Sequence, residues 1–206
     1  MRVILGHIAK TIYRDKYLCL QKRLLDEYSK VSNTDFADLD TLSKLLISGE
    51  DHRFFYHIGF DIIAIARAVK NRLLYDKIEG ASTIEQQLVR VLTNDYQRTF
   101  SRKIREILLA TTLTSVIPKR AIPKIYLNVA YFGAGMTGLQ QTFTKLQISK
   151  ADKISLEDAA SIISRIKYPQ PRKESIKRLT QIEMRKQHLI FLYNKHLNRK
   201  YIKVYG

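Results

Sequence analysis

The 206-residue sequence lacks several features that define other classes of protein. Cys19 is its single cysteine, which excludes an intrachain disulfide and a metal centre built from several cysteines. Prolines and glycines are few, at 4 and 8, and this scarcity favours helices over a turn-rich β architecture. Strand-like alternation of apolar and polar residues is also scarce, so the sequence predicts a mainly α fold.

Long apolar runs are missing as well. The longest mostly apolar stretch, residues 107–117, falls well short of the roughly 20 residues that cross a bilayer. The amino terminus has no long apolar core of the kind that marks a signal peptide, because Arg14, Asp15 and Lys16 interrupt it. We therefore expect neither an export signal nor a membrane-crossing helix in this chain.

Positive charge is what the sequence has in excess. Lys and Arg outnumber Asp and Glu by 36 to 19, and residues 111–206 hold 18 basic but only 5 acidic side chains. A basic half of this kind implies a polyanionic partner: nucleic acid, anionic lipid head groups or a phosphorylated substrate. Charge alone does not choose among them. The hydrophobic content of 45% is ordinary for a globular protein of one domain, or of one domain with two lobes.

Helix signals recur along the chain. Gly49 is expected to end a helix that carries an apolar stripe of Leu42, Leu45 and Leu46. Asp61 is a good N-cap for a second helix. Its apolar positions lie three and four residues apart, at Ile62, Ile65, Ala66, Val69 and Leu73.

Four more helices are expected further on. Ser82 and Glu85 have capping-box spacing, and Ser101 is expected to open a long helix that runs towards Val116. Ser155 and Asp158 are expected to open another helix. The last 30 or so residues alternate basic with apolar positions, a basic amphipathic pattern.

Residues 50–59 form the first motif that could carry chemistry, with two acids, two histidines and three aromatic residues. A carboxylate beside aromatic walls is a plausible general base, because partial desolvation makes it a better proton acceptor. The competing interpretation is a surface loop that carries helix-terminal charges.

Residues 80–90 form the second motif, in which small residues lead into a helix N-terminus. Free backbone N–H groups at such a terminus suit an anion, and Gln86, Gln87 and Arg90 can add side-chain donors. The competing interpretation is a well-capped helix with polar residues on its wet face.

Residues 98–110 form the third motif. On a helix, Glu106 lies four residues after Arg102 and three after Lys103. This spacing fits a solvated face of ion pairs, and it equally fits a carboxylate held among cations that grip a diphosphate. The fourth motif, residues 125–138, has three closely spaced glycines after aromatic residues, which predicts a tight structural turn rather than a dinucleotide site.

In this order and spacing, the four motifs resemble the peptidoglycan glycosyltransferase (transglycosylase) family. That family is the polymerase domain of class A penicillin-binding proteins and of monofunctional transglycosylases. The first pattern, E-D-x-x-F-x-x-H-x-G, is matched by Glu50, Asp51, Phe54, His57 and Gly59. The second, G-x-S-T-I-x-Q-Q-x-x-K, is matched by Gly80, Ser82, Thr83, Ile84, Gln86 and Gln87, with Arg90 in place of lysine.

The resemblance extends to about residue 172. The third pattern, R-K-x-x-E-x-x-x-A, is matched by Arg102, Lys103, Glu106 and Ala110. The fourth, Y-L-N followed by F-G-x-G-x-x-G, is matched by Tyr126, Leu127, Asn128, Phe132, Gly133, Gly135 and Gly138. The family fold implied is a mainly α, lysozyme-like, two-lobed glycosyltransferase domain with a membrane-facing jaw and a long cleft.

The resemblance also implies a reaction and a role for each matched residue. Lipid-linked disaccharide is polymerised into β-1,4 glycan strands, with inversion at the anomeric carbon and release of polyprenyl diphosphate. Glu50 is implied as the base and Glu106 as a second catalytic carboxylate that orients cations or phosphates. We expect Glu50 to face these cations across a single groove. The implied substrate-binding residues are Asp51, Phe54, His57, Ser82, Thr83, Gln86, Gln87, Arg90, Arg98, Arg102 and Lys103.

No cofactor is required by this chemistry, no metal ligand cluster is visible, and a divalent cation could assist at the diphosphate. The expected partners are lipid-linked disaccharide, the growing glycan chain and an anionic membrane surface, with no nucleic acid. The expected location is peripheral, at the outer (periplasmic) face of the bacterial cytoplasmic membrane. We expect an N-terminal extension (1–38), a catalytic domain (39–172) and a basic C-terminal helical tail (173–206). The tail fits surface adhesion or packing on the domain.

The sequence departs from the family pattern at several positions. Arg90 replaces the single ammonium group of the usual lysine with a planar guanidinium group. Glu85 stands where threonine is usual, which predicts a new negative charge beside the phosphate region. Pro123 and Lys124 replace Leu-Glu, and the proline is expected to bend its helix. The alternatives to a polymerase are a catalytically degenerate glycan or lipid-diphosphate binding protein, a nucleic-acid binder and a glycan hydrolase.

Overall fold

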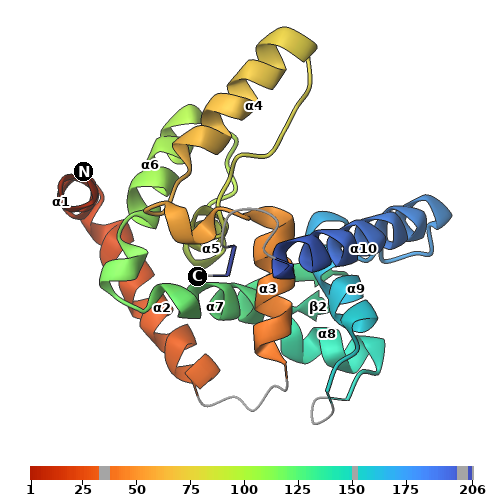
Figure 1. Ribbon diagram of the computed structural model, residues 1–206. Helices are drawn as coiled ribbons and strands as arrows, with labels where there is room; N and C mark the ends of the chain where they lie inside the picture. The colour runs from red at the N-terminus through yellow and green to blue at the C-terminus, as the bar shows by residue number, and fades with distance from the viewer. Residues whose placement is uncertain (33–37, 150–152, 199–203, 206) are drawn as a thin grey trace. The chain divides into compact units, whose positions relative to one another are not determined.

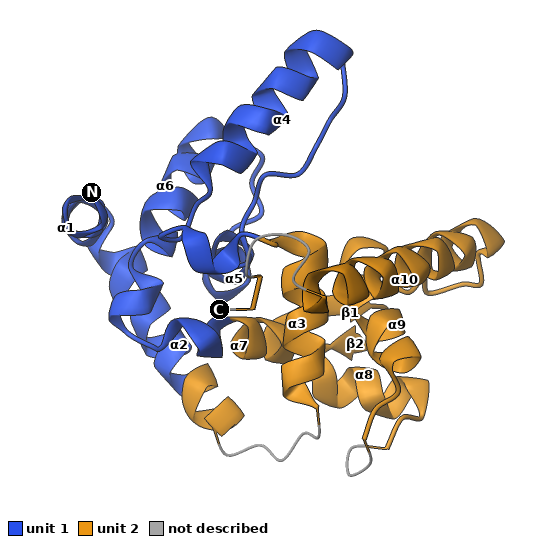
Figure 2. Cartoon of the chain, in the orientation of Figure 1, with its two compact units in different colours: residues 1–26, 53–122 blue, residues 27–52, 123–206 orange. Residues whose placement is uncertain are grey.

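The computed structural model describes residues 1–32, 38–149, 153–198 and 204–205. The fold is mainly α, as predicted, with one short two-stranded sheet in the described part of the chain. Two compact units are built from alternating segments of the sequence (Figure 2). Unit 1 comprises residues 1–26 and 53–122, and unit 2 comprises residues 27–52 and 123–206.

Unit 1 contains the whole of the second and third motifs. Its helices are α1 (Arg2–Ile12), the first part of α2 (Arg14–Ser32), α4 (Ile62–Tyr75), α5 (Ile84–Thr93) and α6 (Phe100–Ala110), as labelled in Figure 1. Short 3-10 turns follow the chain at η1 (Phe54–Tyr56), η2 (Leu113–Ser115) and η3 (Lys119–Ala121). Helix α6 packs against both α5 and α1. The buried apolar side chains of this packing include Leu88, Leu92 and Leu109.

Unit 2 contains the first motif's carboxylates and the glycine turn. Helices α3 (Leu39–Glu50), α9 (Leu156–Lys167) and α10 (Ile176–Leu197) pack against one another, and α7 (Ile122–Val129) and α8 (Gly138–Leu146) flank the sheet in sequence. The shared core of the three packed helices includes Leu45, Leu46, Ile162, Ile163, Ile182 and Leu189. The basic tail is therefore a helix packed on its unit through an apolar stripe.

The predicted glycine turn is confirmed. Strands β1 (Tyr131–Gly133) and β2 (Met136–Thr137) pair antiparallel, with Tyr131 opposite Thr137. Gly133 has a φ of 142°, and a Cβ atom there would lie 2.4 Å from the backbone nitrogen of Gln170. Gly138 has a φ of 70°, and its Cβ atom would lie 2.2 Å from the carbonyl oxygen of Asn128. These glycines let neighbouring backbone approach, which is a structural role.

Two predicted caps are confirmed, and both predicted bounds of helix α6 are wrong. Asp61 caps α4 by accepting from the N–H groups of Ile63 and Ala64, and Ser155 caps α9. Helix α6 begins at Phe100 with Thr99 as its cap, and it ends at Ala110 instead of running on to Val116. Pro123 lies in the first turn of α7, where its missing N–H removes no hydrogen bond within the helix.

Helix α4 is the helix expected after Asp61, but it contributes nothing to the core. None of its residues is buried. Its large apolar side chains face solvent instead, including Ile62, Ile63, Val69, Leu73 and Leu74. The spacing of apolar residues identified the helix, but periodicity alone does not say what an apolar face contacts. Across the described residues, no helix has the length and apolar content needed to span a bilayer.

Candidate active site

A buried carboxylate with three cationic partners forms the centre of unit 1. Glu106 is only 3% exposed. Its Oε2 accepts from Arg90 Nε at 2.9 Å and from Arg102, while its Oε1 accepts from Lys103 Nζ at 2.7 Å and from the second Arg90 nitrogen at 3.2 Å. Arg90 thus forms a bidentate ion pair with the Glu106 carboxylate. We call Glu106, Arg90, Arg102 and Lys103 the cation cluster.

The sequence spacing explains how the cation cluster forms. Arg102 and Lys103 lie one turn before Glu106 on α6, so they meet it on one helix face. Arg90 comes from α5, which packs along α6. Because Glu106 is buried, the interpretation of these residues as a solvated ion-pair face is wrong.

Electrostatics keep Glu106 ionised. Burial alone would raise the pKa of this carboxyl, but hydrogen bonds from Arg90 and Lys103 and their charges hold its pKa below the ordinary value. Burial, together with repulsion from Arg90 and Arg102, lowers the pKa of Lys103, against the pull of Glu106. One anion among three cations leaves a net positive charge. A carboxyl whose pKa is lowered in this way is a poor proton acceptor, and the implied role of Glu106 in orienting the cations stays a prediction.

The N-terminus of α5 adjoins the cation cluster through Lys103. The Lys103 Nζ lies 3.0 Å from Ser82 Oγ and 2.9 Å from Gln86 Oε1. The capping box at this terminus uses Thr83 and Gln86, so the predicted pairing of Ser82 with Glu85 is wrong by one residue. Ser82 takes no part in the capping box, and its hydroxyl oxygen instead accepts a hydrogen bond from Lys103 Nζ. The structure brings Ser82, Gln86 and the third motif together, as predicted.

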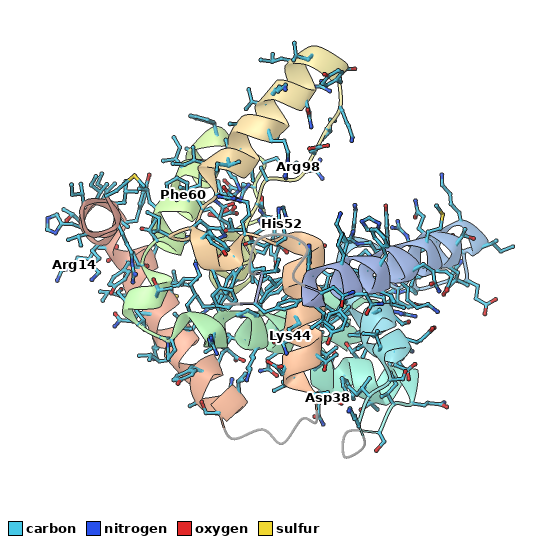
Figure 3. All side chains as sticks on the ribbon, in the orientation of Figure 1. Arg14, Asp38, Lys44, His52, Phe60 and Arg98 are labelled. Carbon is cyan, nitrogen blue, oxygen red and sulfur yellow. The ribbon has the colours of Figure 1, made fainter. Side chains whose placement is uncertain are left out.

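Three other predicted substrate-binding residues of unit 1, Thr83, Gln87 and Arg98, lie outside the cation cluster. The Thr83 hydroxyl caps α5 and donates to the Gly59 carbonyl at 2.7 Å, which gives it a structural role. Gln87 is half-buried on α5. Arg98, labelled in Figure 3, is exposed and takes part in none of the hydrogen bonds of the cation cluster within the described residues.

The aromatic part of the first motif is held by a lysine that sequence reasoning missed. Phe54 is fully buried, and its ring lies edge-on to that of His57. Lys119 Nζ lies 4.7 Å from the centre of the Phe54 ring and donates to the His57 carbonyl at 2.5 Å. Lys119 also pairs with Glu85 at 3.1 Å. None of the sequence motifs includes Lys119, which follows Pro118 and precedes Arg120.

Glu85 is placed differently from the prediction. The sequence predicted a negative charge beside the phosphate region. Instead the side chain is fully buried and turned towards Lys119, with His57 Nδ1 at 3.9 Å. The added carboxylate therefore belongs to the packing beneath the first motif, where Lys119 compensates its charge.

The implied base, Glu50, is the last residue of α3 in unit 2. Its side chain is 18% exposed, and its Oε1 accepts from Arg185 at 2.9 Å. Asp51 follows as the C-cap, 7% exposed, with its N–H donating to the Ile47 carbonyl. The expectation that Glu50 faces the cation cluster across one groove stays a prediction.

Arg185 is the second residue that sequence reasoning missed, and here a signal was present. It lies on the buried stripe of α10, three residues after Ile182 and four before Leu189. A charge on an apolar stripe needs a partner. The sequence pattern predicted only a basic amphipathic helix. It did not predict that Arg185, a charged residue on the apolar stripe, has an acidic partner.

Comparison with known proteins identifies the family. The model of a family described as transglycosylase matches residues 21–192. The chain belongs to the transglycosylase family. A biosynthetic peptidoglycan transglycosylase of Nitrosomonas eutropha is 36% identical over 151 residues, which cover 73% of this chain and 59% of that protein. Its counterpart in Thiobacillus denitrificans is 32% identical over 146 residues, covering 70% and 59%.

Longer proteins of the family match as well. A penicillin-binding protein 1A of Aquifex aeolicus is 35% identical over 124 residues, which cover 60% of this chain and 17% of that protein. The matched region of this transglycosylase-family chain thus spans about three fifths of the biosynthetic transglycosylases and about a sixth of the penicillin-binding protein. The predicted boundaries at residues 38 and 172 stay predictions.

Proposed function

We propose that this chain is a peptidoglycan glycosyltransferase that polymerises lipid-linked disaccharide into β-1,4 glycan strands. The cation cluster is the observation that carries the proposal. It holds three cations around one buried carboxylate, and the names of the relatives report peptidoglycan transglycosylases. A diphosphate is already a good leaving group, so the site needs positive charge and donors more than a strong general acid.

Spare donors make the cation cluster suited to an anion. Within the described residues, the buried Nε of Arg102 and the buried Nε2 of Gln86 have no hydrogen-bond partner. A buried unpaired donor costs free energy that a ligand can return by accepting from it. The diphosphate oxygens of the donor would lie against the partly exposed Arg90 and Lys103, beside Ser82, and would reach the two buried donors only after those side chains shift.

Glu50 supplies the base in this proposal. Only its Oε1 is hydrogen-bonded within the described residues. The proton of the acceptor 4-hydroxyl would pass to the Oε2 atom of Glu50, while the hydroxyl oxygen forms the new bond to the anomeric carbon. The bond from that carbon to the diphosphate breaks, and its electron pair leaves with the diphosphate. Attack opposite to the leaving group inverts the anomeric centre.

Peripheral contact with an anionic membrane accounts for the surface of α4. Its exposed apolar residues include Leu73, at 79% exposure, and exposed basic residues lie among them at Arg67, Lys70, Arg72 and Lys77. Apolar side chains that enter the head-group region beside lysines and arginines are typical of a membrane-surface helix. The location proposed is the outer face of the bacterial cytoplasmic membrane, where the lipid-linked substrate would be presented.

Binding to vesicles tests the membrane contact. Vesicles with 30% anionic lipid should retain the wild type and release the double variant Leu73→Ser, Leu74→Ser. The matched control Leu18→Ser, which changes an exposed leucine of α2, should stay bound. Equal retention of all three proteins would remove α4 from the contact.

Incubation with lipid-linked disaccharide tests the activity. The wild type should form long strands, whereas Glu50→Gln should lose at least about 10²-fold in rate, since a general base contributes on that order. Glu183→Gln, which changes an exposed glutamate of α10, is the matched control and should match the wild type. Substrate binding without strands would favour a degenerate binding protein, and new reducing ends from finished cell wall would favour a hydrolase.

The same assay tests the metal requirement. The proposed reaction needs no cofactor, and a divalent cation would act only by shielding the diphosphate. Full activity in excess chelator is the expected result. Loss of strands that magnesium or manganese restores would assign the cation a part in the reaction.

A further inference from the structure

The charge partner of Glu50 lies on the long helix near the end of the chain. Arg185 of α10 donates from one guanidinium nitrogen to the carbonyl oxygen of Gly49 at 2.7 Å and to Glu50 Oε1 at 2.9 Å. Its side chain is 10% exposed. We infer that Arg185 is a positioning residue that fixes the rotamer of the base and the position of its Oε2 atom. This inference rests on the proposed function.

A glutamate at the last position of a helix needs such a partner. The C-terminus of α3 carries a partial negative charge from its free carbonyls, and a carboxylate there is repelled by it. Arg185 offsets this repulsion and also satisfies a terminal carbonyl. The same guanidinium nitrogen donates to the Gly49 carbonyl and to the Glu50 carboxylate. Without this cation, Glu50 would be expected to turn away from the helix end into solvent.

Gly49 makes the close approach of α10 possible. The sequence predicted that Gly49 ends α3, but the helix continues through Glu50, so that prediction is wrong. A Cβ atom on Gly49 would lie 2.3 Å from Leu189 Cδ2 and 3.0 Å from the Arg185 nitrogen. The glycine therefore serves packing: it lets α10 come near enough for Arg185 to reach the helix end.

The geometry leaves the reactive atom open. Arg185 engages Oε1, and within the described residues Oε2 of Glu50 has no hydrogen-bond donor. The arginine thus restricts the carboxylate to one orientation while it leaves the second oxygen to receive a proton.

The test compares two neighbouring substitutions that remove the same charge. Arg185→Met should lower kcat for strand formation by about 10- to 100-fold, the size of effect expected when a reacting group is misplaced, with KM within about twofold. Lys186→Met is the matched control, because Lys186 pairs with Glu157 and Glu183 and, within the described residues, not with Glu50. It should keep the wild-type kcat.

Rescue experiments, a double variant and melting temperatures separate positioning from a loss of folding. Arg185→Lys keeps the charge and should recover part of the kcat, and guanidinium ion added to Arg185→Ala should do the same. In the background of Glu50→Gln, Arg185→Met should cause no further loss of kcat, because it acts through the missing base. Melting temperatures of all variants would be recorded beside the rates.

Each outcome has a distinct meaning. An equal loss of kcat with and without the Glu50 carboxylate would overturn the positioning role and leave Arg185 a structural residue. A wild-type kcat in Arg185→Met, or a change confined to KM, would overturn it as well. Absence of strands from the wild type would instead contradict the proposed function, so the two failures are distinguishable.

Discussion

The two carboxylates implied in catalysis have opposite surroundings. In unit 1, Glu106 has three cationic partners, four hydrogen bonds and 3% exposure. In unit 2, Glu50 has Arg185 on one oxygen and is 18% exposed. A carboxylate saturated with donors stays ionised and holds cations in place, whereas one with a free oxygen can take a proton. These different surroundings fit the roles that the family resemblance implies, with Glu50 as the base and Glu106 as the carboxylate that orients the cations.

Loss of stability should separate the two carboxylates most strongly. Glu106→Gln leaves three partly buried cations without their anion, and we expect it to lower the free energy of unfolding by about 3 kcal/mol. Glu50→Gln should cost about 1 kcal/mol, because removing a negative charge from a helix C-terminus offsets part of the lost ion pair. Urea unfolding of both variants measures the difference. Equal losses of unfolding free energy in the two variants would contradict the claim that the two carboxylates have different surroundings.

Glu85 offers a third carboxylate, with one lysine and full burial. Glu85→Thr introduces the residue usual in the family and leaves Lys119 without its anion. We expect a loss of about 2 kcal/mol, smaller than for Glu106 because the Lys119 side chain is 21% exposed and can reach water. The double variant Glu85→Thr, Lys119→Met should recover part of it. A neutral single variant would show that the ion pair contributes nothing.

The pH dependence of stability should single out Glu106. Its pKa in the folded protein is lowered, so its contribution is complete above the unfolded value of about 4.3 and is lost as pH falls through the folded value. The stability difference between wild type and Glu106→Gln should therefore be constant from pH 7 to 5 and shrink below about pH 4.3. Urea titrations across this range measure it. A difference that grows on acidification would contradict the argument.

Arg90→Lys should have the smallest effect. It replaces the two-pronged grip on Glu106 with one ammonium, the residue usual in the family, and should cost about 1 kcal/mol. Strand formation should stay within about tenfold of wild type, because the charge remains. Arg90→Met is the comparison that removes the charge and should lose more. Equal rates for the two variants would show that the charge of residue 90 is irrelevant.

Local signals in the sequence predicted the helices and the cation cluster well. Asp61 and Ser155 cap their helices as predicted, because a cap depends on residues two and three positions away. The meeting of Lys103 and Glu106 follows from helix spacing. At the start of α5, capping-box spacing fits two overlapping pairs, Ser82 with Glu85 and Thr83 with Gln86. The structure has the second pair, so the predicted start of the helix was wrong by one residue.

What the sequence did not predict depends on contacts between distant segments. Arg185 reaches Glu50 from 135 residues away, and Lys119 reaches Glu85 from the turn before α7. Gly49 was interpreted as a helix end because its packing partner, Leu189, lies in another helix. The solvent-facing apolar side of α4 was missed for a related reason: periodicity identifies a face, and only tertiary structure shows what covers it.

The division of roles between the carboxylates is tested most directly by measuring, in the same two variants, affinity for the lipid-linked donor and the rate of strand formation. We predict that Glu50→Gln binds the donor as tightly as wild type but loses at least about 10²-fold in rate. Glu106→Gln, in contrast, should lose affinity, because its cations are no longer held in place. Weaker donor binding by Glu50→Gln, or a wild-type rate, would contradict the account.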